Sequence, residues 1–258
     1  MNTDIRVIFV DLGGTFRVIR DDLEYKTAAK ARIAELLGAP GDPTEFFDTV
    51  IDKRYDVYRE WCLRFMCEAP EEMLWTRWLA YDFPKDRVKA AAKELTYAYR
   101  RTKGERVVVE KGVETVRELR RRGYTVGIIS DLVGKGEVDE WLDHDGIRDL
   151  FDTVQQSSIT YIRKPNPAIY FYAMEELGVE AENCCYVGDN LNRDIVGAKA
   201  AGCGMTVAVE YEDMPPLKVT EENRPDAKVI RFEQLLDIFP ARGEVASDRL
   251  IAPVPRGK

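Results

Sequence analysis

Carboxylate, hydroxyl and lysine side chains recur where apolar segments of this chain end. Asp11 follows the apolar run Val7 to Val10, and Asp189 comes two residues after another apolar run that ends at Val187. Carboxylates can hold Mg²⁺, which prefers oxygen ligands, while a lysine and hydroxyls can hold an anion such as phosphate. The candidate side chains for such chemistry, in chain order, are Asp11, Thr15, Ser130, Lys164, Asp189 and Asp194.

The segments between these residues predict a sheet that could position them. Short continuous apolar runs are typical of parallel strands that are covered on both faces. Such runs occur at Val7 to Val10, Thr125 to Ile129, Cys184 to Val187 and Met205 to Val209. Helical patterns alternate with them, at about 112–122, 167–177 and 192–201. We therefore predict an α/β, Rossmann-like fold, a parallel sheet with helices on both faces, whose ligands bind at the carboxyl ends of the strands.

A long helical stretch interrupts this alternation soon after the first strand. Leu23 to Lys103 has an almost continuous helical pattern, and Pro43, Pro70 and Pro84 stand where helices are expected to begin. Apolar residues from Phe47 to Phe65 recur at three- and four-residue steps, which predicts one long amphipathic helix. The predicted division is a core at 1–16 and 106–240, an inserted α-helical cap domain at 17–105, and a loosely held C-terminal tail at 241–258.

The order of the candidate residues resembles the four motifs of the haloacid dehalogenase superfamily. The resemblance covers roughly residues 5–16 and 106–210, and the helical stretch resembles that superfamily's helical cap. Each motif alone is common, but four in order at predicted strand ends are specific. The motifs are Asp11-Leu12-Gly13-Gly14-Thr15, Ile128-Ile129-Ser130-Asp131, Arg163-Lys164-Pro165 and Gly188-Asp189 through Asp194.

The resemblance implies a Mg²⁺-dependent phosphatase that acts on a small phosphorylated metabolite. Asp11 would be the nucleophile and would form an aspartyl-phosphate. Lys164 would be catalytic and, with Thr15 and Ser130, would bind the phosphate through fixed charge and hydroxyl donors. The implied metal ligands are the Asp11 carboxylate, the main-chain carbonyl of Gly13, and the carboxylates of Asp189 and Asp194. For Asp194, capping of a helix at 194–201 is an alternative role.

The first motif departs from the family's phosphatase pattern at Gly13. Those phosphatases usually carry a second aspartate there, which protonates the leaving oxygen and later activates the attacking water. Glycine keeps the main-chain carbonyl but lacks this acid, and acid–base assistance typically contributes about 10²–10⁴-fold. We therefore expect weakened turnover of ordinary phosphomonoesters.

Several activities are compatible with this departure. A substrate with a good leaving group, such as an acyl phosphate, needs no acid, or the cap could supply one. A relative of the superfamily's phosphonate-cleaving enzymes would form a Schiff base with a cap lysine, for which Lys26, Lys30 and Lys53 are candidates. A non-catalytic phosphate-binding or regulatory protein would keep the site without turnover. Dehalogenases proper fit less well, because they work without metal and this chain retains Asp189 and Asp194.

The overall composition limits the partners. The net charge of −8 and the pI of about 5.0 argue against nucleic acid, which needs a basic face. No apolar run approaches the roughly 18 residues of a membrane helix, and the N-terminus lacks a signal core. We expect a cytoplasmic monomer or homodimer with no nucleic-acid or membrane partner. One histidine, His144, excludes a multi-histidine metal site, and five irregularly spaced cysteines predict buried free thiols.

The predicted cap carries residues that could contact an anionic substrate. Arginines there could bind it and tryptophans could stack on it, although most are expected to belong to the cap's surface and core. These residues are Arg54, Arg59, Arg64, Arg77, Trp61, Trp75 and Trp78.

Overall fold

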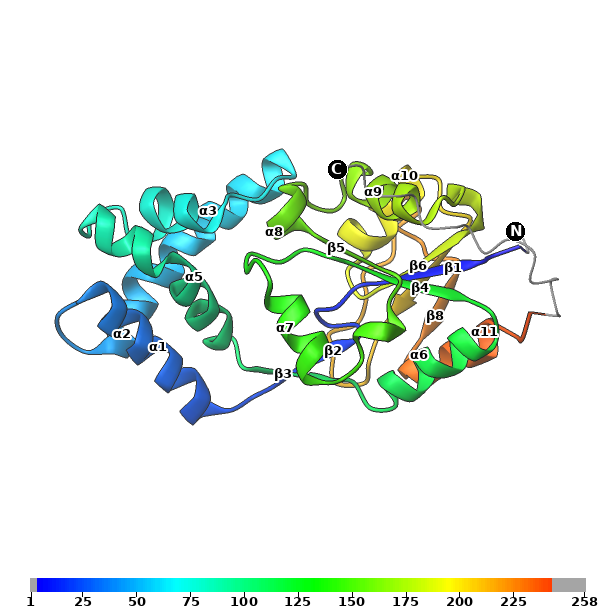
Figure 1. The fold of residues 1–258 in the computed structure, drawn as a ribbon, viewed down its shortest axis with the longest axis horizontal. Helices are drawn as coiled ribbons and strands as arrows, with labels where there is room; N and C mark the ends of the chain where they lie inside the picture. The colour runs from blue at the N-terminus through cyan, green and yellow to red at the C-terminus, as the bar shows by residue number, and fades with distance from the viewer. Residues whose placement is uncertain (1–3, 243–258) are drawn as a thin grey trace, which may run out of the picture.

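A computed structural model describes residues 4–242 of the chain. Its main feature is a six-stranded sheet ordered β5-β4-β1-β6-β7-β8, in which every pair is parallel (Figure 1). The strands are β1 Val7–Val10, β4 Thr125–Ser130, β5 Thr153–Gln156, β6 Cys184–Gly188, β7 Met205–Val209 and β8 Ala227–Val229. The predicted parallel α/β sheet is confirmed.

Alternate residues of each strand pack against helices on opposite faces of the sheet. Ile8 and Val10 of β1 belong to a core shared with α6, α7 and α11, whereas Val7 and Phe9 belong to one shared with α9 and α10. Both faces are therefore dry, which explains why the strands are apolar throughout. These helices are α6 Gly112–Arg121, α7 Glu137–His144, α9 Ala168–Leu177, α10 Val196–Ala200 and α11 Leu235–Ile238. Short helical turns are α8 Ser157–Thr160, η3 Arg148–Leu150, η4 Ala181–Asn183, η5 Leu191–Ile195 and η6 Phe232–Gln234.

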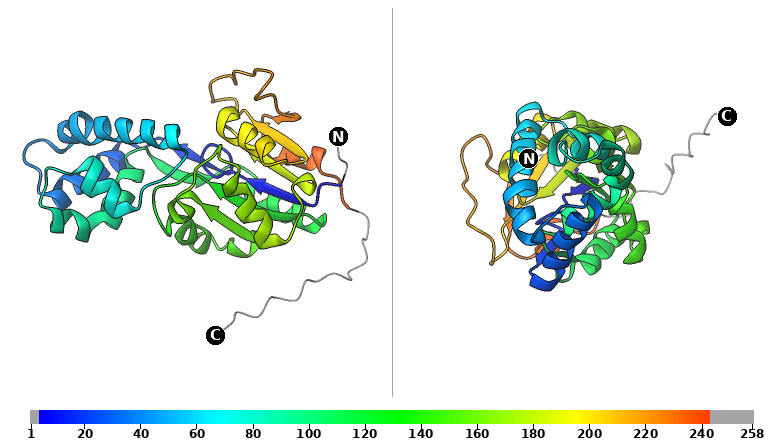
Figure 2. Two further views of the ribbon diagram at one scale, coloured as in Figure 1. Left: turned by 90° about the horizontal axis from the view of Figure 1, so that it is seen from above. Right: turned by 90° about the vertical axis from the view of Figure 1, so that its left-hand side faces the viewer.

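Five helices within residues 23–101 form a separate cluster with its own apolar core, here called the helical insertion. Figure 2 shows it at one end of the molecule, with the sheet at the other. Its helices are α1 Leu23–Leu37, α2 Pro43–Phe46, α3 Asp52–Phe65, α4 Glu71–Met73 and α5 Lys85–Arg101. The long helix predicted at 47–65 is continuous with α2, and its first turn, η1 Phe47–Ile51, is π-helical. A second π-helical segment is η2 Leu74–Leu79.

The two ends of the predicted helical stretch 17–105 are strands, which corrects that expectation. β2 Arg17–Arg20 and β3 Glu105–Val108 pair antiparallel in a two-stranded ribbon between the sheet and the helical insertion. Each has only four residues, and the paired residues are 85 to 91 positions apart (Arg20 pairs with Glu105, and Arg17 with Val108). No local pattern reports such a pairing. The strands β5 and β8 were also not predicted, because they are short and only partly apolar.

Other sequence predictions have mixed outcomes. Cys62, Cys184 and Cys185 are free and buried, as expected, but Cys67 and Cys203 are only half-buried. The predicted tail, 241–258, lies outside the described residues from 243 onward. Within the described part, the Arg242 amide donates to a main-chain oxygen of the fold. No helix among residues 4–242 is long and apolar enough to cross a membrane.

Candidate active site

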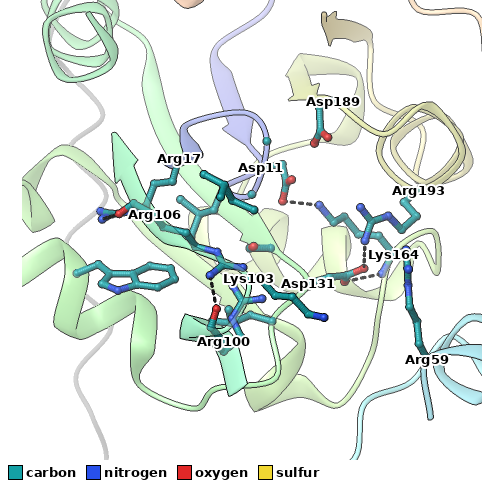
Figure 3. A pocket seen from close by; sticks show the side chains of 17 residues that line it. Asp11, Arg17, Arg59, Arg100, Lys103, Arg106, Asp131, Lys164, Asp189 and Arg193 are labelled. Carbon is teal, nitrogen blue, oxygen red and sulfur yellow. Dashed lines mark hydrogen bonds and ion pairs between the residues drawn. The ribbon is translucent and has the colours of Figure 1, made fainter. Parts of the chain in front are cut away.

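Three neighbouring strands position candidate residues at the same edge of the sheet. β1 lies between β4 and β6, with Val10 level with Ile128 on one side and Val187 on the other. Asp11, Ser130 and Asp189 therefore lie side by side at the carboxyl ends of these strands. With Lys164 they line one cavity of about 580 Å³ (Figure 3). The structure thus brings together four residues that the sequence separates by up to 178 positions.

The Lys164 ammonium group is fully engaged by buried partners. Its Nζ lies 2.7 Å from Asp11 Oδ1 and 2.7 Å from Asp194 Oδ1. It also donates to the Tyr186 hydroxyl at 2.8 Å and to the main-chain oxygen of Ile129 at 3.2 Å. Burial alone would lower the pKa of Lys164, but attraction to Asp11 and Asp194 outweighs it and raises this pKa above its usual value. Lys164 is therefore a fixed positive charge at the bottom of the cavity.

Tyr186 is a site residue that the sequence interpretation missed. It lies in β6 among apolar neighbours, and its hydroxyl donates to the Ile129 oxygen at 2.8 Å while accepting from Lys164. A tyrosine inside an otherwise apolar strand, two residues before the Gly188-Asp189 pair, is the one signal that could have revealed it. Its hydroxyl helps to set the direction of the Lys164 side chain.

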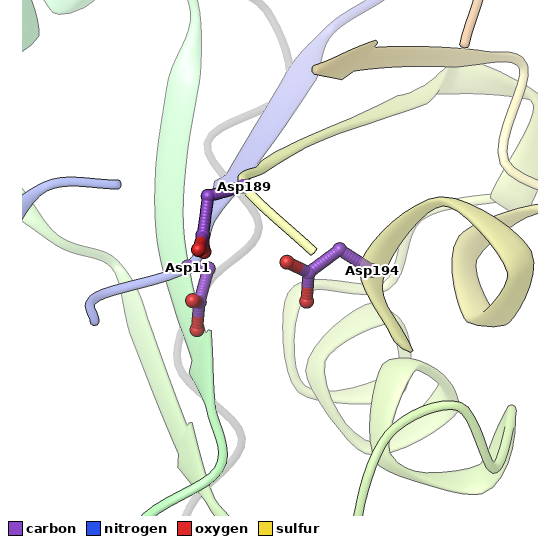
Figure 4. Close-up of side chains that lie close together, drawn as sticks. All are labelled: Asp11, Asp189 and Asp194. Carbon is purple, nitrogen blue, oxygen red and sulfur yellow. The ribbon is translucent and has the colours of Figure 1, made fainter. Parts of the chain in front are cut away.

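Three carboxylates crowd together beside this lysine. One oxygen each of Asp11, Asp189 and Asp194 lies within 4.8 Å of the others (Figure 4). Burial, together with repulsion from Asp11 and Asp194, raises the pKa of Asp189 to about 7. Burial likewise raises the pKa of Asp11, against the attraction of Lys164. Three carboxylates, two buried and one half-buried, thus face one ammonium group, and a divalent cation would neutralise the surplus of negative charge. The donor set, all oxygen, is of the kind that Mg²⁺ binds.

Asp194 does not begin a helix, which corrects the capping alternative. The helical segment begins at Leu191, and Asn190 is its N-cap, with a side-chain oxygen that accepts from the Arg193 amide. Asp194 lies one turn further on and is fully buried. Its Oδ2 accepts from the Asn190 amide at 2.9 Å, which leaves Oδ1 directed at Lys164. Asp194 therefore supports the loop and Lys164 at the same time.

The glycine pair after Asp11 combines a tight turn with an open space. Gly14 has φ of +84°, and a Cβ there would lie 2.5 Å from Asp189 Oδ2, so only glycine fits. Gly13 also lines the cavity, yet a Cβ built on it would meet no atom within 4 Å. The space in which the family's usual second aspartate would stand is therefore empty and accessible.

The two hydroxyl residues occupy different positions. Ser130 is buried and lines the cavity, and its hydroxyl makes no hydrogen bond within residues 4–242. Thr15 is buried behind the cavity, and its Oγ1 lies 3.3 Å from Asp189 Oδ1, to which it donates. Ser130 is thus free to contact a ligand, whereas Thr15 contacts a candidate metal ligand.

Most of the singled-out residues of the helical insertion lie away from this cavity, and only Arg59 lines it. Arg54 forms an ion pair with Asp82, and Trp75 is fully buried with its Nε1 donating to Thr96. The candidate Schiff-base lysines Lys26, Lys30 and Lys53 do not line it either. The first two are paired with Asp21 and Asp48, and the third is exposed.

Several charged residues that line the cavity were not predicted. Asp131 Oδ1 accepts from the Lys164 amide at 3.0 Å, and its Oδ2 lies 3.8 Å from Arg193 Nη1. Arg17 and Arg106 come from the β2–β3 ribbon, while two further cations come from the end of α5 and the residues after it. The unpredicted cations are Arg17, Arg100, Lys103, Arg106 and Arg193.

A buried contact joins the helical insertion to the loop that carries Lys164. We call it the clasp, and it comprises residues 66–68 and 161–163. The Glu68 amide donates to the Tyr161 oxygen at 3.0 Å, and the Arg163 amide donates to the Met66 oxygen at 2.9 Å. The Glu68 carboxylate, 3% exposed, forms an ion pair with Arg163 and lies 3.0 Å from the Ser157 hydroxyl. The residue next to Lys164 is therefore anchored in the helical insertion.

Comparison with known proteins agrees with this fold and site. A family model described as haloacid dehalogenase-like hydrolase matches residues 5–202. The chain belongs to this family of hydrolases.

The similar proteins include phosphatases. A glyceraldehyde 3-phosphate phosphatase from Pyrococcus furiosus is 28% identical over 241 residues, which cover 91% of this chain and 93% of that protein. One from Methanopyrus kandleri is 35% identical over 131 residues, covering 49% of this chain and only 54%, about half, of its own length. A solved structure, a HAD phosphatase from Thermococcus onnurineus, has a TM-score of 0.60 at 21% identity and covers 92% of this chain and 99% of its own. At that identity the structural likeness describes the fold, and the sequence relatives support a hydrolase of the phosphatase type.

Proposed function

We propose that this protein is a Mg²⁺-dependent phosphohydrolase that acts on a small phosphorylated metabolite through an aspartyl-phosphate on Asp11. The observation that carries the proposal is the 2.7 Å contact between Lys164 Nζ and Asp11 Oδ1 inside a cluster of three carboxylates, two buried and one half-buried. This arrangement offers a nucleophilic oxygen, a fixed positive charge and a cation site within one cavity. The phosphatase names of the relatives support the same reaction class.

The chain's own residues divide the proposed reaction between them. A carboxylate oxygen of Asp11 bonds to phosphorus while the ester P–O bond breaks and the leaving oxygen takes the electron pair. Lys164 and the free Ser130 hydroxyl offset charge on the phosphoryl oxygens. Water then cleaves the acyl phosphate and restores the carboxylate. Mg²⁺, when held by Asp11, Asp189, Asp194 and the Gly13 carbonyl, would reduce repulsion between Asp11 and the phosphate.

Apart from the residues assigned above to Mg²⁺ and to the phosphate, the cavity lacks an evident acid for the leaving oxygen. Gly13 has no side chain, and the described lining of the cavity contains no histidine, cysteine, tyrosine or glutamate. Asp131 is engaged by the Lys164 amide and lies near two arginines. We therefore propose that turnover is weak for alkyl phosphates and faster for substrates whose leaving oxygen needs no proton.

We further propose that residues 17–105 act as a cap over a core of 1–16 and 106–240. Two observations support this division. The helical insertion has its own apolar core, and residues 17–105 contribute Arg59, Arg100 and Lys103 to the lining of the cavity.

The proposal is tested by hydrolysis of p-nitrophenyl phosphate, acetyl phosphate and an alkyl phosphate with Mg²⁺. We expect turnover of the first two, slower turnover of the third, and loss of about 10⁴-fold or more in Asp11→Asn. Asp237→Asn, which makes the same change at an exposed site on α11 outside the cavity, is the matched control. If no compound is hydrolysed while phosphate still binds, the phosphatase proposal fails and a phosphate-binding role takes its place.

A further inference from the structure

The charges that line the cavity are sorted by position. Asp11, Asp189 and Lys164 lie on one side in Figure 3, which we call the acidic end. The third carboxylate of the lining, Asp131, accepts from the Lys164 amide and lies 3.8 Å from Arg193 Nη1. On the other side lie four cations that we call the cationic end. They are Arg17, Arg100, Lys103 and Arg106.

The cationic end is a connected structure and not a set of separate surface residues. Arg17 Nη2 donates to the main-chain oxygen of Arg106 at 2.7 Å, and Arg106 Nη1 donates to that of Arg100 at 3.0 Å. Arg17 is 6% exposed, and its guanidinium stands over the Trp141 ring, 4.8 Å from the centroid. The arginines are therefore held in place before any ligand arrives, which lowers the entropy cost of binding.

The fold itself only partly neutralises these cations. Three carboxylates behind the cavity wall form ion pairs with Arg17, Arg100 and Lys103; they belong to Asp145, Glu137 and Asp52. Arg106 has no ion pair among residues 4–242, and its Nε and Nη2 have no hydrogen-bond partner there. Arg17 Nε also lacks a hydrogen-bond partner among these residues, and it is buried. Leaving a buried donor without a partner is costly, so Arg17 Nε indicates a missing acceptor.

The surroundings of Arg106 also destabilise its charged form. Burial, with added repulsion from Arg100, lowers its pKa to about 9. An anion placed against Arg106 would relieve both effects and would find the forked donors that suit a carboxylate or phosphate. The phosphoryl group that is transferred cannot be that anion, because Asp11, Ser130 and Lys164 bind it at the acidic end.

We infer that the substrate is a phosphate monoester that carries a second anionic group, a carboxylate or another phosphate, which Arg106 and Arg17 bind at the cationic end. This inference rests on the proposed function, since it takes the acidic end as the site of the reacting phosphoryl group. It narrows the substrate to doubly anionic molecules and makes Arg106 a residue that determines specificity.

The test compares the affinity of matched phosphonates, whose C–P bond replaces the ester. Phosphonopropionate and propylphosphonate have the same length and differ only in the terminal carboxylate, and ethylenebisphosphonate places a phosphonate there. Affinities for the full chain with Mg²⁺ are measured by calorimetry. We expect a dianion to bind about tenfold more tightly than propylphosphonate, which corresponds to about 1.4 kcal/mol. The dianion that binds better identifies the second group.

In Arg106→Met, the affinities for the dianions and for propylphosphonate are expected to become nearly equal. Arg106→Lys is expected to retain part of the difference. Arg64→Met removes the same charge from an exposed site on α3 and should leave the preference unchanged. Equal affinities in the unaltered protein, or a preference that Arg106→Met leaves intact, would overturn the inference. If Arg106→Met fails to fold in a thermal melt, the comparison in the unaltered protein and in Arg106→Lys still decides.

Binding does not require turnover, so the two proposals fail separately. If p-nitrophenyl phosphate is hydrolysed with Mg²⁺ but no dianion is preferred, the inference is wrong and the phosphatase proposal stands. If nothing is hydrolysed but dianions are preferred in an Arg106-dependent manner, the recognition site stands and the proposed activity does not.

Discussion

The acidic and cationic ends of the cavity balance their charges in different ways. At the acidic end, three carboxylates within 4.8 Å of one another share one buried ammonium group, so the surplus is negative. At the cationic end, the partners of Arg17 and Arg100 lie behind the wall, and Arg106 has none among the described residues. The acidic end is built on the sheet, whereas the cationic end is built on the β2–β3 ribbon and α5. We therefore expect chemistry and recognition to respond to separate substitutions.

The largest effect should come from removing the cation that the acidic end is proposed to hold. A chelator, or Asp189→Asn, should lower turnover of acetyl phosphate by about 10³-fold, because a bound metal contributes several kcal/mol of charge stabilisation. Initial rates over a Mg²⁺ titration measure this loss. Asp189→Asn should reach half of its maximal rate at a higher Mg²⁺ concentration than the unaltered protein. Asp237→Asn, a matched change on α11 far from the cavity, is the control. Full activity in the chelator would show that the carboxylates serve another purpose.

The next largest effect should be a gain in the rate of alkyl phosphate hydrolysis. Gly13→Asp places a carboxylate in the open space beside Asp11, where no atom would meet its Cβ. If the missing acid is the only defect, hydrolysis of an alkyl phosphate should rise by about 10²-fold, the lower limit of acid–base assistance. Hydrolysis of p-nitrophenyl phosphate, whose leaving oxygen needs no proton, should change little. A folded Gly13→Asp protein that shows no gain would place the defect elsewhere at the acidic end.

A smaller effect is expected at the support beneath Lys164. Tyr186→Phe removes the hydroxyl that accepts from Lys164 and donates to Ile129. A net hydrogen bond contributes about 1 kcal/mol, so the free energy of unfolding should fall by about that amount and kcat by about fivefold. Urea unfolding and kcat measurements separate the two losses. Tyr124→Phe, which removes a hydroxyl that donates to the Pro240 main-chain oxygen at 2.9 Å outside the cavity lining, controls for stability alone. An equal loss of kcat in both variants would argue against a positioning role for Tyr186.

The smallest effect should come from the exposed member of the cationic end. Lys103 is 39% exposed and already lies 2.6 Å from Asp52, and such pairs contribute about 0–1 kcal/mol. Lys103→Met should therefore weaken phosphonopropionate binding by about twofold, much less than Arg106→Met. A calorimetric comparison of the two variants tests this order. If Lys103→Met has the larger effect, the second anion lies nearer to α5 than to the ribbon.

The sequence predicted the acidic end better than the cationic end for a physical reason. Asp11 and Asp189 directly follow buried strands and Ser130 is the last residue of one. Apolar runs of that kind can be recognised locally. Parallel topology then brings their carboxyl ends together. Arg17 and Arg106 instead lie on two four-residue strands whose pairing spans most of the insertion. Their shared cavity depends on contacts that no nearby residue encodes.

Local sequence patterns also fail to place some individual side chains. The helical segment near Asp194 was predicted to start at about residue 192, close to the observed Leu191, but Asn190 and not Asp194 caps it. Of four arginines considered on the insertion, only Arg59 reaches the cavity, since helical spacing alone does not say which side of the bundle faces the sheet. Tyr186 was not recognised as a site residue because it lies in an apolar strand and fits its hydrophobic pattern.

The clasp also limits how freely parts of this molecule could be exchanged with those of a relative. Its Glu68 comes from the insertion and its Arg163 from the loop next to Lys164, and both are buried. A chimera that replaced only residues 23–101 would remove Glu68 and leave Arg163 a buried cation without its closest carboxylate, a change that typically costs about 3–5 kcal/mol. A transplanted insertion would therefore have to bring a carboxylate for Arg163, or be exchanged together with residues 161–163. In this chain the insertion and the loop that carries Lys164 depend on each other through a buried ion pair, although they are far apart in the sequence.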